Sequence, residues 1–237
     1  MKKSEDRKVS TSSMKYDHVE GLDISNPSTR CPVVLLLDTS KSMAGQPIKE
    51  LEEALCQFIT EVKDDVAAAT SVELCIVTLD ENATVQLPFT AAIDLSPKRL
   101  GLKAAGGTFT GKALERAIEQ IENRRAQYAE NGIFSFAPWL VLMTDGKPGD
   151  NWQAPANKLL AMADKLRMQY IGLAMGEKAN LEILRQMLPP HPGPLKLSHV
   201  RFKEFFRWLS DSLSAVSCSC ISEQAVPKIP KWSDYFD

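Results

Sequence analysis

Short, unbroken apolar runs alternate along this chain with longer segments whose apolar residues recur at helical spacing. The clearest run covers residues 33–37 (VVLLL), and in the next segment, residues 48–62, the apolar side chains repeat every three or four positions. A strand buried on both faces has the first pattern, and an amphipathic helix has the second. The alternation predicts a Rossmann-like, doubly wound α/β fold with a mostly parallel sheet and helices on both faces.

The same two patterns continue to the end of the alternating region. Further strands are expected at residues 72–78, 83–87, 139–143, 170–174 and 195–197, and further helices at residues 113–121, 159–166, 181–187 and 202–216. The tripeptide at residues 80–82 (DEN) is a turn signal between two of these strands. Residues 72–78 and 83–87 should therefore form a hairpin, which gives the sheet one antiparallel edge strand.

The two ends of the chain lack this periodicity. Residues 1–29 are polar and predict a flexible N-terminal arm, residues 30–222 form the expected domain, and residues 223–237 form an irregular C-terminal tail. The tail carries Trp232, Tyr235 and Phe236, and aromatic side chains are frequent anchors at interfaces. These aromatics either bind a partner away from the main site or fold back on their own domain.

Charge and cysteine content narrow the class of protein. The formal net charge is −2, so no overall field attracts nucleic acid or an acidic membrane surface. No apolar run is long enough to span a bilayer, and no apolar stretch follows the charged first residues as in a signal peptide. The five cysteines are irregularly spaced; Cys56 and Cys75 are expected in the core, and the pair Cys218 and Cys220 lacks the further ligands of a zinc site. A cytoplasmic location fits these features.

Oxygen-bearing side chains follow two of the predicted strands. Asp38, Ser40 and Ser42 come directly after the first strand, and Asp145 follows the strand at residues 139–143. Thr108 precedes a predicted helix. Because the carboxyl ends of parallel strands meet at one edge of a sheet, these five residues should converge there. Carboxylates and hydroxyls are hard ligands that suit Mg²⁺, or else Mn²⁺ or Ca²⁺.

These motifs resemble the metal-ion-dependent adhesion site (MIDAS) of von Willebrand factor A (VWA) domains. Residues 34–43 (VLLLDTSKSM), 107–114 (GTFTGKAL) and 142–152 (LMTDGKPGDNW) are similar in more detail to the bacterial TerY group, which is associated with tellurium resistance. The resemblance, over residues 30–219, implies a VWA fold and a cation-dependent protein-binding module rather than an enzyme. It implies a partner that offers a Glu or Asp to the metal, and kinase-like or phosphatase-like proteins as candidates.

The resemblance assigns the metal-binding role to Asp38, Ser40, Ser42, Thr108 and Asp145. This chain has Lys41 where the family usually has glycine, which places a positive charge beside the site. Apolar residues expected near its rim are Met43, Phe109 and Trp152, either as partner contacts or buried under the loops.

The same residues are compatible with other interpretations. Ser40 or Ser42 alone is compatible with a helix N-cap. Asp38 as a phosphoryl-transfer aspartate lacks the second acid two positions on, where Ser40 stands. Residues 106–112 approach a phosphate-binding loop, but Ala113 replaces its Ser or Thr and no good strand precedes it. Asp150 either helps to shape the loop next to Asp145 or is a solvated turn residue, and the second interpretation is favoured. Metal-assisted hydrolysis or phosphoryl transfer at the five residues is the alternative function.

Overall fold

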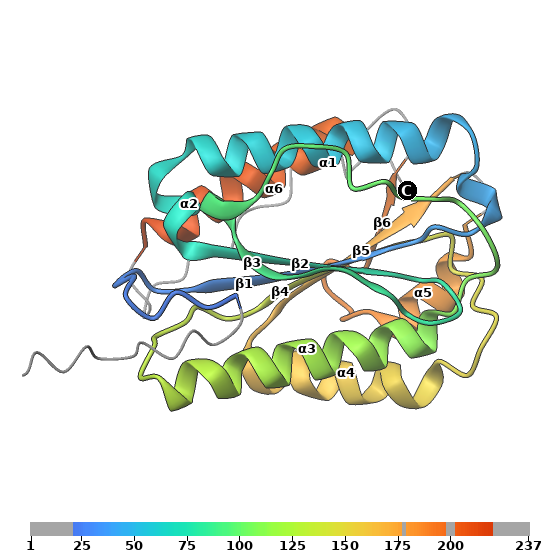
Figure 1. The fold of residues 1–237 in the computed structure, drawn as a ribbon. Coiled ribbons are helices and arrows are strands. Elements are labelled where there is room, and N and C mark those ends of the chain that lie inside the picture. The colour runs from blue at the N-terminus through green and yellow to red at the C-terminus, as the bar shows by residue number, and fades with distance from the viewer. Residues whose placement is uncertain (1–20, 177–178, 198–201, 220–237) are drawn as a thin grey trace, which may run out of the picture.

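A six-stranded sheet in the order β3-β2-β1-β4-β5-β6 forms the middle layer of the fold (Figure 1). The computed structural model describes residues 21–176, 179–197 and 202–219. The strands are β1 (Cys31–Leu37), β2 (Val72–Thr78), β3 (Val85–Ala91), β4 (Trp139–Thr144), β5 (Gln169–Met175) and β6 (Pro194–Leu197). Neighbouring strands are parallel except β2 and β3, which are antiparallel.

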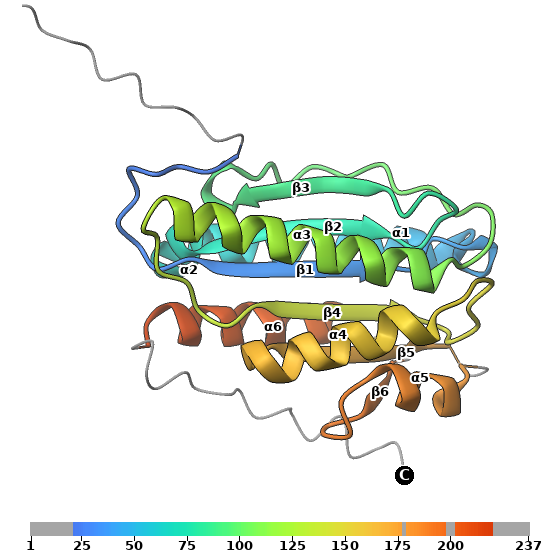
Figure 2. The same ribbon diagram turned by 90° about the horizontal axis from the view of Figure 1, so that it is seen from below.

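Helices cover both faces of this sheet (Figures 1 and 2). One face carries α1 (Gln46–Asp64), α2 (Val66–Ser71) and α6 (Phe202–Ser217), and the other carries α3 (Thr110–Glu130), α4 (Gln153–Leu166) and α5 (Leu181–Met187). Short 3-10 turns, η1 (Lys41–Met43) and η2 (Ala92–Asp94), lie in the loops after β1 and β3. Within the described ranges, every helix is too short or too polar to span a bilayer.

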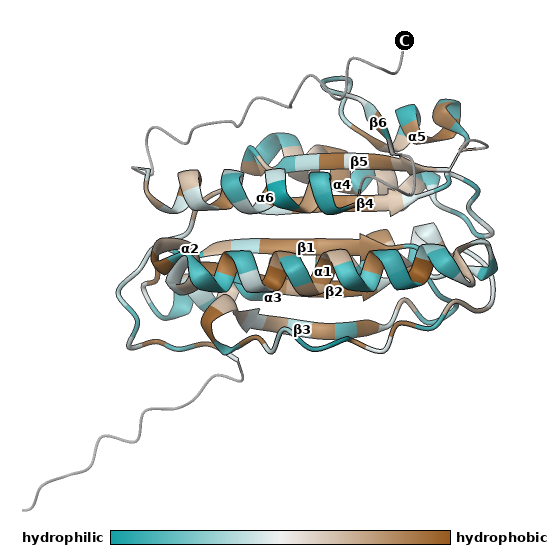
Figure 3. Cartoon of the chain, turned by 90° about the horizontal axis from the view of Figure 1, so that it is seen from above, coloured by the Kyte–Doolittle hydropathy of each residue, from teal (hydrophilic) through white to brown (hydrophobic). Residues whose placement is uncertain are grey.

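The sheet divides the apolar core into two clusters. Alternate residues of β1 point to opposite faces, so Val33 and Leu35 pack under α1 and α6 whereas Val34 and Leu36 pack under α3 and α4. Figure 3 shows the strands largely brown, and teal and brown alternating along α1 and α6. This two-sided burial is why β1 is an unbroken apolar run, and it confirms the predicted fold class.

The predicted elements differ from the structure at β3 and α2, and α3 and α4 are longer than the helices predicted at residues 113–121 and 159–166. β3 runs from Val85 to Ala91 rather than over residues 83–87, because Ala83 adopts a left-handed turn conformation with φ 47°. α2 was not predicted, since a six-residue helix is too short to show a helical period. It is started by Asp65, whose carboxylate accepts a hydrogen bond from the Ala68 amide at 2.8 Å.

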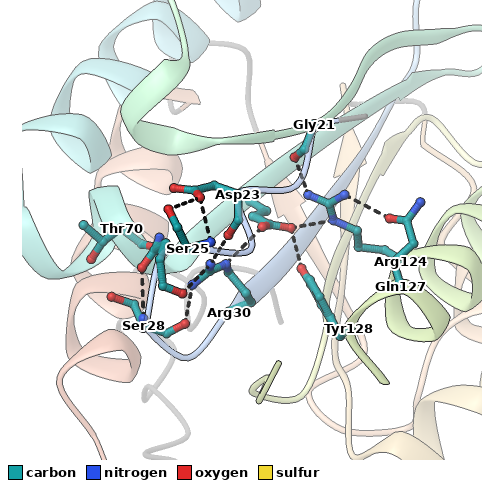
Figure 4. Close-up of polar contacts among 11 residues, drawn as sticks. Gly21, Asp23, Ser25, Ser28, Arg30, Thr70, Arg124, Gln127 and Tyr128 are labelled. Carbon is teal, nitrogen blue, oxygen red and sulfur yellow. Dashed lines mark hydrogen bonds and ion pairs between the residues drawn. The ribbon is translucent and has the colours of Figure 1, made fainter. Parts of the chain in front are cut away.

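Residues 21–29, which fall inside the predicted flexible arm, pack against the domain. Leu22 is buried, and the Asn26 side-chain amide donates to the Thr70 carbonyl at 2.8 Å. The Arg30 guanidinium donates to the carbonyls of Asp23 and Asn26 at 2.8 and 2.9 Å, as Figure 4 shows for Asp23. Residues 1–20 lie outside the described residues, as do residues 223–237 with Trp232, Tyr235 and Phe236, and Cys220.

A buried ionic cluster ties this segment to the amino-terminal end of the sheet. Glu73, the second residue of β2, forms ion pairs with Arg30 at 3.3 Å and with Arg124 of α3 at 2.6 Å. It also accepts a hydrogen bond from the Tyr128 hydroxyl at 2.5 Å. Arg124 reaches on to the carbonyl of Gly21 at 2.6 Å (Figure 4). The buried carboxylate thus has two cationic partners.

Candidate metal centre

Asp38 lies at the carboxyl end of β1, in the middle of the sheet. Its backbone amide donates to the Met143 carbonyl at 3.0 Å, which extends the β1–β4 pairing by one residue. The side chain is fully buried and its carboxylate accepts from the Ser40 amide and the Thr144 hydroxyl, both at 2.9 Å. The Thr108 hydroxyl approaches both carboxylate oxygens, at 3.4 and 3.5 Å.

Ser40 and Ser42 face each other beside this carboxylate. Ser40 is extended, and η1 then turns the chain so that the two hydroxyl oxygens lie 2.9 Å apart. Ser40 is buried and Ser42 is exposed. The N-cap interpretation is wrong for both serines, because α1 begins after Gly45 and neither hydroxyl caps a helix.

The Thr108 loop is held against the β1 loop by backbone hydrogen bonds. The Ala105 amide donates to the Thr39 carbonyl at 2.8 Å, and the Lys41 amide donates to the Gly106 carbonyl at 3.3 Å. No strand leads into this loop, since residues 101–109 have no regular secondary structure. The backbone therefore lacks the strand-to-helix geometry of a phosphate-binding loop, as the sequence indicated.

Asp145 follows β4 and stays partly accessible, with a side chain 20% exposed. One carboxylate oxygen accepts from the Lys147 amide at 3.1 Å, and the other lies 3.8 Å from the Lys147 ammonium. The Asp145 carbonyl accepts from the Asn180 amide at 2.8 Å, which ties the loop after β4 to the start of α5. Asp145 is close enough to Asp38 for its charge to act on that carboxyl.

The surroundings of Asp38 disfavour the charged form of its carboxyl group. Burial raises the pKa of its carboxyl above the ordinary value, and the nearby negative charge of Asp145 raises it further, although hydrogen bonds from Ser40 and Thr144 lower it in part. Among the described residues, no lysine or arginine lies within ion-pair distance of Asp38. Glu73 is equally buried but has two arginines. Burying a charge without a partner costs free energy, so the ionised Asp38 carboxylate requires a counter-ion that the described residues do not supply.

The donor set is compatible with a hard divalent cation. It consists of three hydroxyls and two carboxylates, and across the described residues no group of three or more His, Cys, Asp or Glu offers a different metal site. Oxygen donors of this kind suit Mg²⁺, Mn²⁺ or Ca²⁺. The structure therefore gathers Asp38, Ser40, Ser42 and Thr108 by hydrogen bonds, with Asp145 beside them.

Sequence reasoning missed two residues that shape the centre. Thr144 bonds Asp38, and its signal was its place directly before Asp145 in the Thr-Asp-Gly motif. Asp150 is not a solvated turn residue: its two oxygens accept from the amides of Gly111 and Lys112, both at 2.9 Å. It therefore caps α3, and no local sequence signal links residues that lie 38 and 39 positions apart.

The loops around Asp150 and Thr108 are joined at a second point. The Gly149 amide donates to the Thr108 carbonyl at 2.7 Å. A Cβ at Gly111 would lie 2.2 Å from the Asn151 carbonyl oxygen, so only glycine allows the helix and loop to approach this closely. These contacts set Thr108 relative to the loop that carries Asp145.

Of the three apolar residues considered for the rim, two are buried. Met43 is 2% and Trp152 is 8% exposed, and they belong to opposite core clusters. Phe109 stays partly exposed, with the Lys112 ammonium 5.1 Å from its ring centre. Cys75 is buried as expected, but Cys56 is only half-buried on α1.

The sequence matches a known protein family. The family model described as von Willebrand factor type A domain matches residues 33–203. The collagen alpha-5(VI) chain of Mus musculus is 27% identical over 155 residues, which is 63% of this chain but 6% of that relative.

Two solved structures share the fold. Proximal thread matrix protein 1 from the mussel byssus, with a zinc-occupied MIDAS motif, has a TM-score of 0.54 and 20% identity over 79% of this chain and 48% of its own. The vWF domain of the type V pili tip protein Mfa5 from Porphyromonas gingivalis has a TM-score of 0.61 and 11% identity over 86% of this chain and 99% of its own. Since the family model covers most of the sequence, this chain belongs to the von Willebrand factor type A domain family.

Proposed function

We propose that this chain is a divalent-cation-dependent protein-binding module whose metal ligands are Asp38, Ser40, Ser42, Thr108 and Asp145. The observation that carries the proposal is Asp38, a fully buried carboxylate among hydroxyls with no lysine or arginine partner within the described part of the chain. A cation at this place supplies the missing positive charge. The zinc-occupied MIDAS motif of the mussel byssus protein supports the same use of the fold.

The proposed ligands differ in their exposure to solvent. Asp38 and Ser40 are buried and fix the inner side, whereas Ser42 and Asp145 border solvent. A bound cation, most simply Mg²⁺, offers an open coordination position to a carboxylate from a partner. The three hydroxyl ligands are neutral, so they leave much of the ion's charge for that carboxylate.

The resemblance to the bacterial TerY group supports a narrower form of the proposal. In that form the protein acts in the cytoplasm in a stress response linked to tellurite, and its partner is kinase-like or phosphatase-like. The chain spans only 6% of the matched collagen chain and about half of the byssus protein, so their whole-protein roles do not transfer directly.

The test is recovery of partners from the native cell with and without chelator. The unmodified chain should recover its partner in Mg²⁺ and lose it in excess chelator, and Asp145→Ala should behave like the chelated protein while keeping its circular dichroism spectrum. Equal recovery in chelator contradicts the proposal.

Metal-assisted hydrolysis at the same residues is the competing function. The loops that form the centre, at residues 38–46, 79–84, 101–112 and 145–152, contain no histidine to serve as the general base and no cysteine nucleophile. If the unmodified chain hydrolyses phosphoesters or nucleotides in Mn²⁺ and Asp38→Ala does not, the protein is an enzyme.

A further inference from the structure

Four lysines stand on the loops that surround the proposed centre: Lys41, Lys103, Lys112 and Lys147. All four are exposed. Lys41 lies between the two serines, and Lys147 follows Asp145 by two residues. Lys112 is in the first turn of α3, and Lys103 is two residues before Ala105, whose amide bonds the β1 loop. We call these four residues the lysine rim.

The acidic side chains of the same loops are turned inward instead. The Asp80 carboxylate accepts hydrogen bonds from the Thr78 hydroxyl at 2.7 Å and from the Asn82 amide at 2.9 Å, and Asp150 caps α3. Both are half-buried. Glu81 is the exposed acid of these loops among the described residues. The exposed charged side chains around the centre are therefore mostly lysines, with Glu81 and the partly exposed Asp145 as the acids among them.

The lysine rim has two electrostatic effects. It repels a free divalent cation, which weakens metal binding in the absence of a partner. It attracts carboxylates, and the described rim lysines have few internal carboxylates to bind: Lys147 lies 3.8 Å from Asp145, while Lys112 donates to the Glu81 carbonyl at 2.8 Å. An approaching acidic segment satisfies the metal and the lysines together.

We propose that the partner segment is multiply acidic, with one carboxylate for the metal and at least one more for the lysine rim. This inference rests on the proposed function and adds the chemistry of its partner. It also gives Lys41 a role: it makes metal and partner bind cooperatively, because a carboxylate bound at Lys41 offsets the repulsion that the cation meets there. Such coupling is reciprocal, so the acidic segment raises metal affinity by the same factor by which metal raises segment affinity.

The experiment uses the full chain, a Glu-rich peptide and a peptide of equal length with a single Glu among Gly and Ser. Mn²⁺ affinity is measured by calorimetry with and without each peptide, and peptide affinity by fluorescence anisotropy at several salt concentrations. The rim variant is Lys41→Glu with Lys147→Glu. Its matched control is Lys158→Glu with Lys165→Glu, which makes the same charge change at exposed positions of α4 outside these loops, at the loss of the surface ion pair between Lys158 and Glu122.

The rim variant should shift the two affinities in opposite directions. Without peptide it should bind Mn²⁺ more tightly, and with Mn²⁺ it should bind the Glu-rich peptide more weakly, each by about threefold to tenfold at low salt. The control should change neither by more than about twofold, as expected for distant screened charges. In the unmodified chain the Glu-rich peptide, but not the single-Glu peptide, should raise Mn²⁺ affinity.

Three results overturn the inference and leave the proposed function intact. The first is an unchanged affinity of the rim variant for the Glu-rich peptide while chelator still abolishes binding. The second is no rise in Mn²⁺ affinity when the Glu-rich peptide is present. The third is metal-dependent binding of a single-stranded oligonucleotide with the same affinity as the Glu-rich peptide. If the chain binds no Mn²⁺ at all, the proposed function fails, and this inference fails with it.

Discussion

Replacing Glu73 with Gln should destabilise the protein far more than removing an exposed acid. The Glu73 side chain is 2% exposed, and its carboxylate lies between the guanidinium groups of Arg30 and Arg124, which are also buried. The amide of Gln keeps the volume but removes the negative charge. Both arginines then remain buried without a counter-ion, and Tyr128 loses a charged acceptor.

The expected loss in the free energy of unfolding is about 3–5 kcal/mol, which is typical when one partner of a buried ion pair is removed. The control is Glu53→Gln, since Glu53 pairs with Arg99 at 3.5 Å on the surface with side chains 49% and 60% exposed. Loss of that pair should cost no more than about 1 kcal/mol, because exposed ion pairs are screened by water.

Urea unfolding, followed by circular dichroism and by tryptophan fluorescence, measures both losses. Coincident transitions establish two-state behaviour, and an unchanged slope means that midpoints can be compared. Mn²⁺ affinity should stay the same in Glu73→Gln, because Glu73 lies at the amino-terminal end of β2, opposite the metal centre. A loss below about 1 kcal/mol, equal to that of the surface control, refutes the reasoning.

Three further predictions concern the loops and the thiols. Asp150→Ala removes the two hydrogen bonds that cap α3 and should cost about 1–2 kcal/mol in urea unfolding, with weaker Mn²⁺ binding in calorimetry. Gly111→Ala places a Cβ 2.2 Å from a carbonyl oxygen and should cost about 1–3 kcal/mol, whereas Gly107→Ala, with its nearest contact at 3.5 Å, should be tolerated in the same assay. Burial raises the pKa of the Cys31 and Cys75 thiols to about 12. At pH 8, iodoacetamide should therefore label the exposed Cys218 in the native protein and label Cys31 and Cys75 only after urea unfolds it. Peptide mass spectrometry measures the labelling of each cysteine. Equal labelling of all three in the native state contradicts the burial.

The parts of the fold that could be predicted are those with a strong local pattern. β2 and α5 have the predicted bounds, and β1, β4 and β5 extend the predicted runs by one or two residues at an end, because continuous burial leaves a plain apolar signal. The hairpin partner β3 was displaced, since its half-exposed residues carry a weaker pattern. α2 was missed because it is shorter than two helical turns.

The candidate centre shows the same division between local and non-local signals. Asp38, Ser40 and Asp145 were found because each follows a strand, and strand ends converge in a parallel sheet. Asp150 and the Glu73 cluster were not found, since their partners are distant in sequence and depend on how helices dock. Trp152 and Met43 were left open between rim and core, because a loop sequence does not specify which side chains turn inward.

The most direct test of the central claim is thermal unfolding of the unmodified chain and of Asp38→Asn, with and without Mg²⁺ or Mn²⁺. A cation that binds the native state stabilises it, by about 2.7 kcal/mol when its concentration is a hundred times Kd. The unmodified chain should gain stability with metal, and Asp38→Asn should lose that gain. Without metal, Asp38→Asn should be as stable as the unmodified chain or more so, because it removes a buried charge that has no partner, in contrast to Glu73→Gln. Retention of the metal-dependent gain in Asp38→Asn, or a metal-free loss as large as that of Glu73→Gln, contradicts a cation site built on Asp38.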